Sequence, residues 1–298
     1  MAYVLTGALE LGLLYALMAL GVYITFRILD FPDLTVDGSF TTGGGIAAIM
    51  IISGYSPWLA TFAAFLGGAA AGLMTGLLHT KGRINGLLSG ILMMIALHSI
   101  NLRIMGAPNL SVARLETVFT HVNVIPHMLI AIIIIKLLLD AFFRTDLGLA
   151  LRATGDNPRM IASLGANTDL AKIVGVSLSN GLVALSGALI AQEQGFANIS
   201  MGIGMIVIGL ASVIIGEAIF GAPTVFRATL AVILGSIVYR VVVALALRMP
   251  WLNAQDLKLI TAVLVIIALV VPTIRRTWKQ TSVARKRSQE LSGGDADA

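Results

Sequence analysis

Hydrogen-bonding side chains recur at helical spacing within the most apolar parts of this 298-residue chain, and they are its first candidates for contact with a solute. Residues three or four apart lie on one face of a helix, as His98 and Asn101 would, and as Ser177 and Asn180 would. The group that begins at Asp37 precedes Gly43–Gly45, where a broken or re-entrant helix would expose hydroxyls and backbone groups. Inside apolar helices, such side chains can border a hydrated path or bind a substrate. The alternative is structural: interhelical hydrogen bonds or, at the start of the second span, capping of the helix by Thr35 or Asp37. The candidates for the substrate path are Asp37, Ser39, Thr41 and Thr42, then His98 and Asn101, then Ser177 and Asn180.

The same search finds no set of residues suited to catalysis. The apolar stretches contain no paired carboxylates, no serine and lysine dyad, and no histidine and glutamate metal motif. The four histidines lack metal-ligand spacing, and the chain has no cysteine. No G-x-x-x-x-G-K sequence followed by Ser or Thr is present to cradle nucleotide phosphates. We therefore predict no catalytic residue, no metal site and no cofactor held by this chain.

Ionised side chains within an apolar span are costly and need partners. Glu10 and Arg240 are each expected about 10 Å inside the same side of the membrane, at about 1.5 Å of rise per residue. We predict a structural ion pair between them, in preference to a role in substrate binding. For Glu217, near the opposite end of its span, the candidate partners are Arg227 and the arginines of residues 144–172.

The composition indicates that an integral membrane protein positions these residues. Hydrophobic residues make up 57% of the chain and charged residues only 12%, with a mean hydropathy of +0.94. A soluble globule needs about a quarter charged residues. The apolar stretches are long enough to cross a membrane as helices, so we predict an all-α fold of about eight to ten transmembrane helices and no barrel. The nine candidate spans are 4–28, 36–53, 57–78, 85–106, 123–142, 170–192, 201–220, 225–248 and 257–273.

Basic residues in the connections predict the topology, because cytoplasmic loops are enriched in Lys and Arg. Basic segments occur at 81–83, 144–172 and 275–287, and an even number of spans separates each from the next. All three should lie on the cytoplasmic side, with the N-terminus outside and the C-terminus in the cytoplasm. The net charge of +5 reflects this arrangement and not nucleic-acid binding. The membrane domain covers 1–276, and 277–298 is expected to form a mobile polar tail.

The longest hydrophilic connection, residues 144–172, contains a short helix with clear end signals. Asn157 can cap it, Pro158 suits its first position, and Gly165 can supply the left-handed residue that ends it. So short a helix is marginal alone in water, which suggests that it docks on another surface. A solvated connector between two spans is the alternative. The apolar edge of the helix comprises Met160, Ile161 and Leu164, beside Arg159 and Ser163.

This connection resembles the ATPase-coupling region of the permease subunits of bacterial ABC importers, in the superfamily of branched-chain amino acid, ribose and nucleoside permeases. In that family T-x-x-G-x-A-(L/I)-R-A leads into a short helix that ends in L-G. Two flanking matches follow the family's order. Residues 11–29 are similar to its opening G-x-x-Y-A-L-x-A-L-G, and residues 179–191 to its small-residue helix after the coupling loop. The matching residues in the connection are Thr145, Gly148, Ala150, Leu151, Arg152, Ala153, Leu164 and Gly165.

Two segments depart from the best-known members of this family. The segment DLTVDGSFTTGGG lacks the asparagine and histidine found in branched-chain amino acid permeases. A glycine-rich run near the end is kept only in part. Both variants resemble the branch assigned to tryptophan or tyrosine import. The residues that remain of the glycine-rich run are Ser212, Gly216, Gly221, Ala222 and Gly235.

The resemblance implies the permease subunit of an ATP-driven, binding-protein-dependent importer in the bacterial cytoplasmic membrane. This subunit would form the path for a small solute, an aromatic or branched-chain amino acid. Its implied partners are two ABC ATPase subunits that hold ATP and magnesium, an external substrate-binding lipoprotein, a second permease in a homodimer, and membrane lipid. The resemblance assigns ATPase coupling to Asp156, Asn157, Pro158, Arg159, Met160, Ile161, Ser163, Leu164 and Gly165.

Two other classes are compatible with a polytopic helical protein: an ion-coupled secondary transporter or channel, and an intramembrane enzyme. No buried row of acidic residues or repeated filter motif favours the first, and no catalytic set favours the second. An inverted repeat that relates spans one to four with spans six to nine would suit alternating access.

Overall fold

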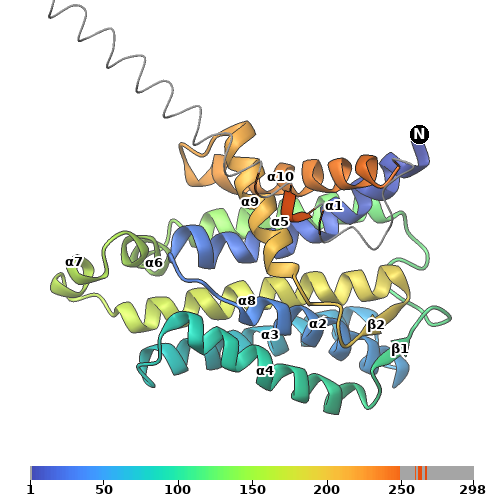
Figure 1. Ribbon diagram of the computed structural model, residues 1–298, viewed down its shortest axis with the longest axis horizontal. Helices are drawn as coiled ribbons and strands as arrows, with labels where there is room; N and C mark the ends of the chain where they lie inside the picture. The colour runs from blue at the N-terminus through green and yellow to red at the C-terminus, as the bar shows by residue number, and fades with distance from the viewer. Residues whose placement is uncertain (1, 249–258, 260, 264–265, 267–298) are drawn as a thin grey trace, which may run out of the picture.

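The computed structural model describes residues 2–248, 259, 261–263 and 266. In this part of the chain, long helices lie side by side with roughly parallel axes (Figure 1). Seven of them are long and apolar enough to cross a membrane, and an eighth apolar helix has 16 residues. The predicted all-α membrane fold is confirmed. The ninth predicted span, 257–273, lies mostly outside the described residues, and the tail 277–298 lies wholly outside them.

The order of elements follows the predicted spans closely. The first helix continues directly into a π-helical segment, η1, and two short helices occupy the hydrophilic connection. In chain order the elements are α1 (Ala2–Val22), η1 (Tyr23–Ile28), α2 (Thr35–Ile52), α3 (Pro57–Thr80), α4 (Gly86–Met105), β1 (Asn109–Ser111), α5 (Val124–Phe142), α6 (Asp146–Asp156), α7 (Pro158–Ser163), α8 (Thr168–Gln194), β2 (Phe196–Asn198), α9 (Met205–Phe220) and α10 (Val225–Ala246).

The connections gather at two ends of the bundle. One end carries α6 and α7, and at the other β1 pairs antiparallel with β2 (Figure 1). At the α6–α7 end, Lys81 lies 3.4 Å from Asp169, and Lys172 Nζ lies 3.3 Å from His79 Nε2. The basic segments 81–83 and 144–172 therefore lie at the same end, as the even number of spans between them predicted.

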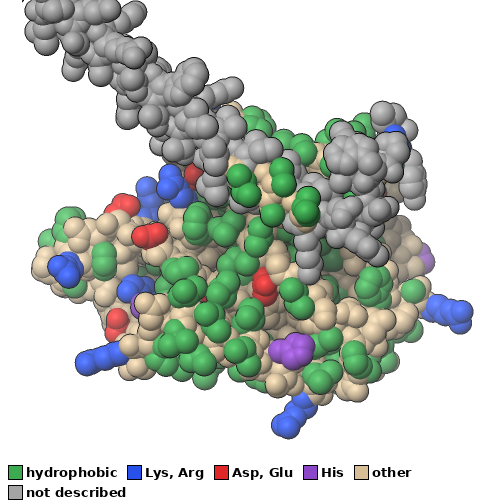
Figure 2. Space-filling model, viewed as in Figure 1, with side chains coloured by type: hydrophobic (Ala, Val, Ile, Leu, Met, Phe, Trp, Pro, Cys, Tyr) green, Lys and Arg blue, Asp and Glu red, His purple; other side chains and the backbone are tan. Residues whose placement is uncertain are grey.

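The surface of the bundle suits a hydrocarbon environment. Hydrophobic side chains extend across the middle of the face in view, whereas Lys and Arg lie mainly toward its edges (Figure 2). Helix α5 is the clearest case, because Ile130, Ile134 and Leu138 are all exposed. Such a surface would be costly in water and is expected of helices that face lipid.

Helix α8 is the centre of the packing and contacts α1, α2 and α3. Glycines allow the α2–α8 contact, because their backbones approach too closely for any side chain. A Cβ atom on Gly43 would lie 1.9 Å from the carbonyl oxygen of Ala184, and one on Gly187 would lie 2.1 Å from that of Phe40. This is the small-residue packing expected between membrane helices.

The Gly187→Ala variant should lower stability by about 1–3 kcal/mol, because the added methyl group has no space beside α2. The matched control is Gly7→Ala, whose Cβ would meet nothing within 4 Å. Alanine favours helix by about 1 kcal/mol over glycine, so the control should be neutral or stabilised. Thermal unfolding of the purified protein in detergent measures both. Equal midpoints for the two variants would contradict the close-packing interpretation.

Helix α2 begins only after a non-helical segment, residues 29–34, in which Leu29, Phe31 and Asp33 are buried. The ring of Phe31 packs edge-on against His79, with centroids 5.1 Å apart, and Asp33 is almost fully buried. Irregular backbone of this kind is tolerated at membrane depth where protein surrounds it. The helix itself runs unbroken through Gly43–Gly45, so the predicted break lies before the helix and not within it.

The predicted caps of α2 are wrong. Asp33 Oδ1 accepts a hydrogen bond of 2.9 Å from Thr35 N, so neither Thr35 nor Asp37 caps this helix with its side chain. An aspartate two residues before the first helical N–H groups is well placed for this role. The proposed inverted repeat stays a prediction, since its last span lies mostly outside the described residues.

Candidate functional site

Three side-chain caps shape the connection between α5 and α8. Thr145 Oγ1 accepts from Gly148 N at 3.3 Å, Asn157 Oδ1 from Met160 N at 3.1 Å, and Asn167 Oδ1 from Leu170 N at 3.0 Å. Asn157 is extended, with φ −156°, as expected of a residue before proline, and so it separates α6 from α7. Gly165 has φ +84°. The predicted start and left-handed end of the short helix are confirmed, although the helix stops at Ser163, one residue early.

The two helices of this connection differ in how they attach to the bundle. On α6, Leu151 is fully buried, and its side chain reaches the backbone of Gly175 on α8. No residue of α7 is buried, and Met160 and Leu164 at its end are 55% and 72% exposed. Figure 1 shows α7 projecting beyond the helical bundle. Because α6 is packed against the bundle, it holds α7 outside the bundle, with the apolar side chains of α7 exposed.

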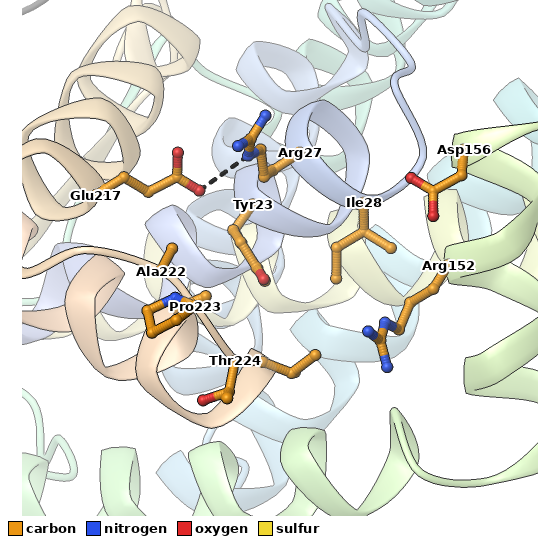
Figure 3. Close-up of a pocket in the computed structure, with 11 residues that line it drawn as sticks. Tyr23, Arg27, Ile28, Arg152, Asp156, Glu217, Ala222, Pro223 and Thr224 are labelled. Atoms are coloured by element: carbon orange, nitrogen blue, oxygen red, sulfur yellow. Dashed lines mark hydrogen bonds and ion pairs between the residues drawn. The ribbon is translucent and has the colours of Figure 1, made fainter. Parts of the chain in front are cut away.

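A cavity of about 350 Å³ is lined by residues of α6, η1, the end of α9 and the loop between α9 and α10 (Figure 3). Arg27 Nε forms an ion pair of 3.0 Å with Glu217 Oε1 on one wall, and Arg152 and Asp156 extend from α6 on the other. Glu217 therefore pairs with Arg27, and the predicted partners, Arg227 and the arginines of the connection, are wrong. Arg27, at the same end of the predicted first span, was the available signal for this pair.

A second cavity, of about 490 Å³, lies between α2, α4 and residues 199–203. Four of the eight predicted path residues line it: Asp37, Thr41, His98 and Asn101. The remaining wall is mostly apolar, which is typical of a site for a small organic ligand with a few orienting polar groups. Its other lining residues are Gly38, Met94, Ile95, Ser99, Ile199 and Ile203.

The other four predicted path residues make hydrogen bonds between packed helices. Ser39 Oγ donates to Asn180 Oδ1 at 2.7 Å, Thr42 Oγ1 donates to Asn101 Oδ1 at 2.8 Å, and Ser177 Oγ donates to a carbonyl oxygen of α3 at 2.7 Å. Their geometry fits the structural alternative better than a solute path. Asp33, which accepts from Asn180 Nδ2 at 2.6 Å, belongs to this network and was missed. An acid directly after Pro32, at the start of a span, was the available signal.

Asp37 links α2 to the start of α9. Its carboxylate accepts hydrogen bonds from Gly204 N at 2.8 Å and Ile206 N at 2.9 Å, and Thr41 Oγ1 accepts from Gly202 N at 3.1 Å. The first N–H groups of a helix have no partner within it and carry the positive end of its dipole. The Asp37 carboxylate satisfies both needs. Asp37 also lines the cavity, so it holds the start of α9 close to residues 199–203, which form part of the cavity wall.

The predicted ion pair between Glu10 and Arg240 is wrong. The Arg240 guanidinium instead lies over the ring of Tyr15, with Cζ 3.6 Å from the ring centroid. Its buried Nε has no hydrogen-bond partner among the described residues. Position along a span predicts only the depth of a side chain. The direction in which each helix points that side chain decides which residue it contacts. An aromatic face can stabilise a cation in place of a carboxylate.

A buried ion pair within α5, which the sequence analysis missed, also contacts α10. Lys136 pairs with Asp140 one helical turn away, and Thr229 Oγ1 donates to Asp140 Oδ1 at 2.9 Å. Lys136 Nζ also lies 3.4 Å from the ring centroid of Phe226. The four-residue spacing of opposite charges in an apolar span was the available signal. Among the described residues, no group of three or more His, Cys, Asp or Glu is placed to hold a metal ion.

Comparison with known proteins places this arrangement in a family. The family model for the permease component of branched-chain amino acid transport systems matches residues 4–270. This chain belongs to that family. The permease is also 46% identical, over 272 residues, to the tyrosine transport system permease protein of Clostridioides difficile (strain R20291). That alignment covers 91% of the permease and 92% of its relative.

Two solved structures share the fold of the permease. One is PsaBC from Streptococcus pneumoniae in complex with Fab, with a TM-score of 0.52, 16% identity, and coverage of 88% of the permease and 89% of that chain. The other is a metal-chelate type ABC transporter in an inward-facing conformation, with a TM-score of 0.51, 18% identity, and coverage of 90% and 84%. At such low identities these likenesses describe the fold alone.

Proposed function

We propose that this permease is the membrane subunit of an ATP-driven importer, with its α6–α7 end in the cytoplasm. One observation carries the proposal: α7 presents Met160 and Leu164 to solvent on a helix fixed at both ends, by Asn157 and Gly165. Exposed apolar side chains on a short helix with both ends capped are suited to insertion into a groove of a partner protein. The partner is an ABC ATPase that binds ATP and magnesium, and the coupling residues run from Asp156 to Gly165.

The complete importer then contains two ATPase subunits and two copies of this permease. An external lipoprotein delivers the solute to the β1–β2 end, and the whole assembly lies in the bacterial cytoplasmic membrane. The N-terminus is outside and the C-terminus in the cytoplasm. This arrangement assigns the energy source to a separate chain, in agreement with the lack of any nucleotide-binding motif here.

The solute we propose is an amino acid with an aromatic side chain, of which tyrosine is the first candidate. The support is the name of the relative that is 46% identical and the shape of the cavity between α2 and α4. Its apolar wall can accept a ring, and its polar residues can orient the ends of the solute. The proposed path residues are Asp37, Thr41, His98 and Asn101.

The proposal is tested by reconstituting the permease in proteoliposomes with an ABC ATPase and a binding lipoprotein encoded beside it. We expect uptake of labelled tyrosine that requires ATP and the binding protein. The control is an ATPase whose phosphate-binding lysine is replaced by alanine, which should abolish uptake. Uptake by the permease alone, driven by a proton or sodium gradient, would instead establish a secondary transporter.

A further inference from the structure

We propose that a third cavity, where α5, α6 and the start of α10 meet, binds the phosphate-bearing headgroup of an anionic phospholipid. Its volume is about 450 Å³, which is sufficient for a headgroup. It adjoins the cavity of Figure 3, and both share Arg152 and the loop before α10. The lining residues are Asp140, Phe143, Arg144, Arg152, Pro223, Thr224, Val225 and Phe226.

The position of this cavity matches the level of lipid headgroups. Helix α5 ends at Phe142 and α10 begins at Val225, so the cavity lies where two apolar spans meet the membrane surface. Phe226 is 47% exposed, and together with the exposed side chains of α5 it forms an apolar border on the lipid side. A headgroup in the cavity could therefore keep its acyl chains in the membrane. A free anion would gain nothing from that border.

The charges around the cavity favour an anion. Neither Arg144 nor Arg152 forms an ion pair with a described acid. The carboxylate of Asp140 is already engaged by Lys136 and Thr229. In the adjoining cavity, Glu217 pairs with Arg27, and the other acid in its lining, Asp156, forms no ion pair with a described residue.

Arginine is the side chain best suited to bind phosphate, because its planar guanidinium offers two parallel N–H donors. Basic pockets between transmembrane helices are a known form of lipid headgroup site. A bound headgroup would bridge Arg144 and Arg152 and so fix α6 against the ends of α5 and α10. This inference goes beyond the proposed function, because it requires no ATPase and no solute.

Native mass spectrometry of the purified full-length permease tests the site. We compare adducts of phosphatidylglycerol with those of phosphatidylcholine, for the native chain and for Arg144→Gln with Arg152→Gln. The double variant should bind phosphatidylglycerol about tenfold more weakly or worse, because it loses two charge-assisted contacts, and should bind phosphatidylcholine as before. The matched control, Lys81→Gln with Arg83→Gln, removes the same charge at the same end of the bundle and should bind both lipids as the native chain does.

A companion variant, Arg144→Lys with Arg152→Lys, keeps both positive charges. It shows whether a loss of lipid binding in the glutamine variant reflects the missing guanidinium groups or a misfolded protein. It should show an intermediate affinity, because lysine cannot donate in the paired geometry. Equal phosphatidylglycerol binding by the native and double glutamine proteins would overturn the proposal. So would full competition by inorganic phosphate at equal concentration, which would indicate a free-anion site, or displacement of the lipid by the ATPase, which would indicate a protein interface.

Discussion

The Asp37→Ala variant should reduce ATP-driven uptake by about tenfold or more, since each hydrogen bond to a charged acceptor contributes about 1.5–3 kcal/mol. The substitution removes two such bonds and leaves Gly204 N and Ile206 N without their acceptor at the start of α9. The start of α9 should then move away from α2 and displace residues 199–203, which line the cavity together with α2. Uptake in the reconstituted importer, measured against substrate concentration, reports the loss.

Two further variants separate the effect of the hydrogen bonds at Asp37 from the effect of its charge. Asp37→Asn keeps one carbonyl acceptor but turns an amide donor toward the second N–H, so its uptake should lie between those of the native and alanine proteins. Asp30→Asn removes the same charge from an exposed residue seven positions earlier, and its uptake should match the native value. A fall in thermal midpoint without any change in uptake per folded molecule would show that Asp37 only stabilises the fold.

The features that sequence reasoning predicted correctly are those determined by neighbouring residues. Asn157 caps α7 through an amide only three residues away, and Gly165 ends the helix by its own backbone conformation. Both signals are visible in a short stretch of sequence. The spans follow the same logic, because twenty apolar residues in a row have few alternatives to a membrane helix.

The features that it could not predict depend on how helices are turned about their axes. Asp37 meets amides that are 167 and 169 residues further along the chain, and no pattern near Asp37 indicates them. Arg240 was predicted at the same depth as Glu10, but its guanidinium lies over the ring of Tyr15. The path residues divide in the same way. Those on one side of α2 reach a cavity, whereas Ser39, on another side, meets Asn180 in the packed interior.

The double variant Met160→Asp with Ile161→Asp should abolish the response of ATP hydrolysis to the loaded binding protein, while the permease itself stays folded. Neither residue is buried, so the change leaves the bundle intact. Two carboxylates in an apolar cleft of the ATPase would have to be desolvated without a partner, at a cost of several kcal/mol. The ATPase should therefore dissociate, or remain bound without transmitting its closure.

The matched control is Met160→Leu with Ile161→Leu, which keeps the apolar character and approximate volume of the helix edge. It should retain the stimulation of ATP hydrolysis. Co-purification of the ATPase with each variant, and hydrolysis with and without the loaded binding protein, distinguish loss of binding from loss of transmission. Full stimulation of the aspartate variant would show that α7 is a solvated connector. The contact with the ATPase would then have to lie on α6, which is at the same end of the bundle.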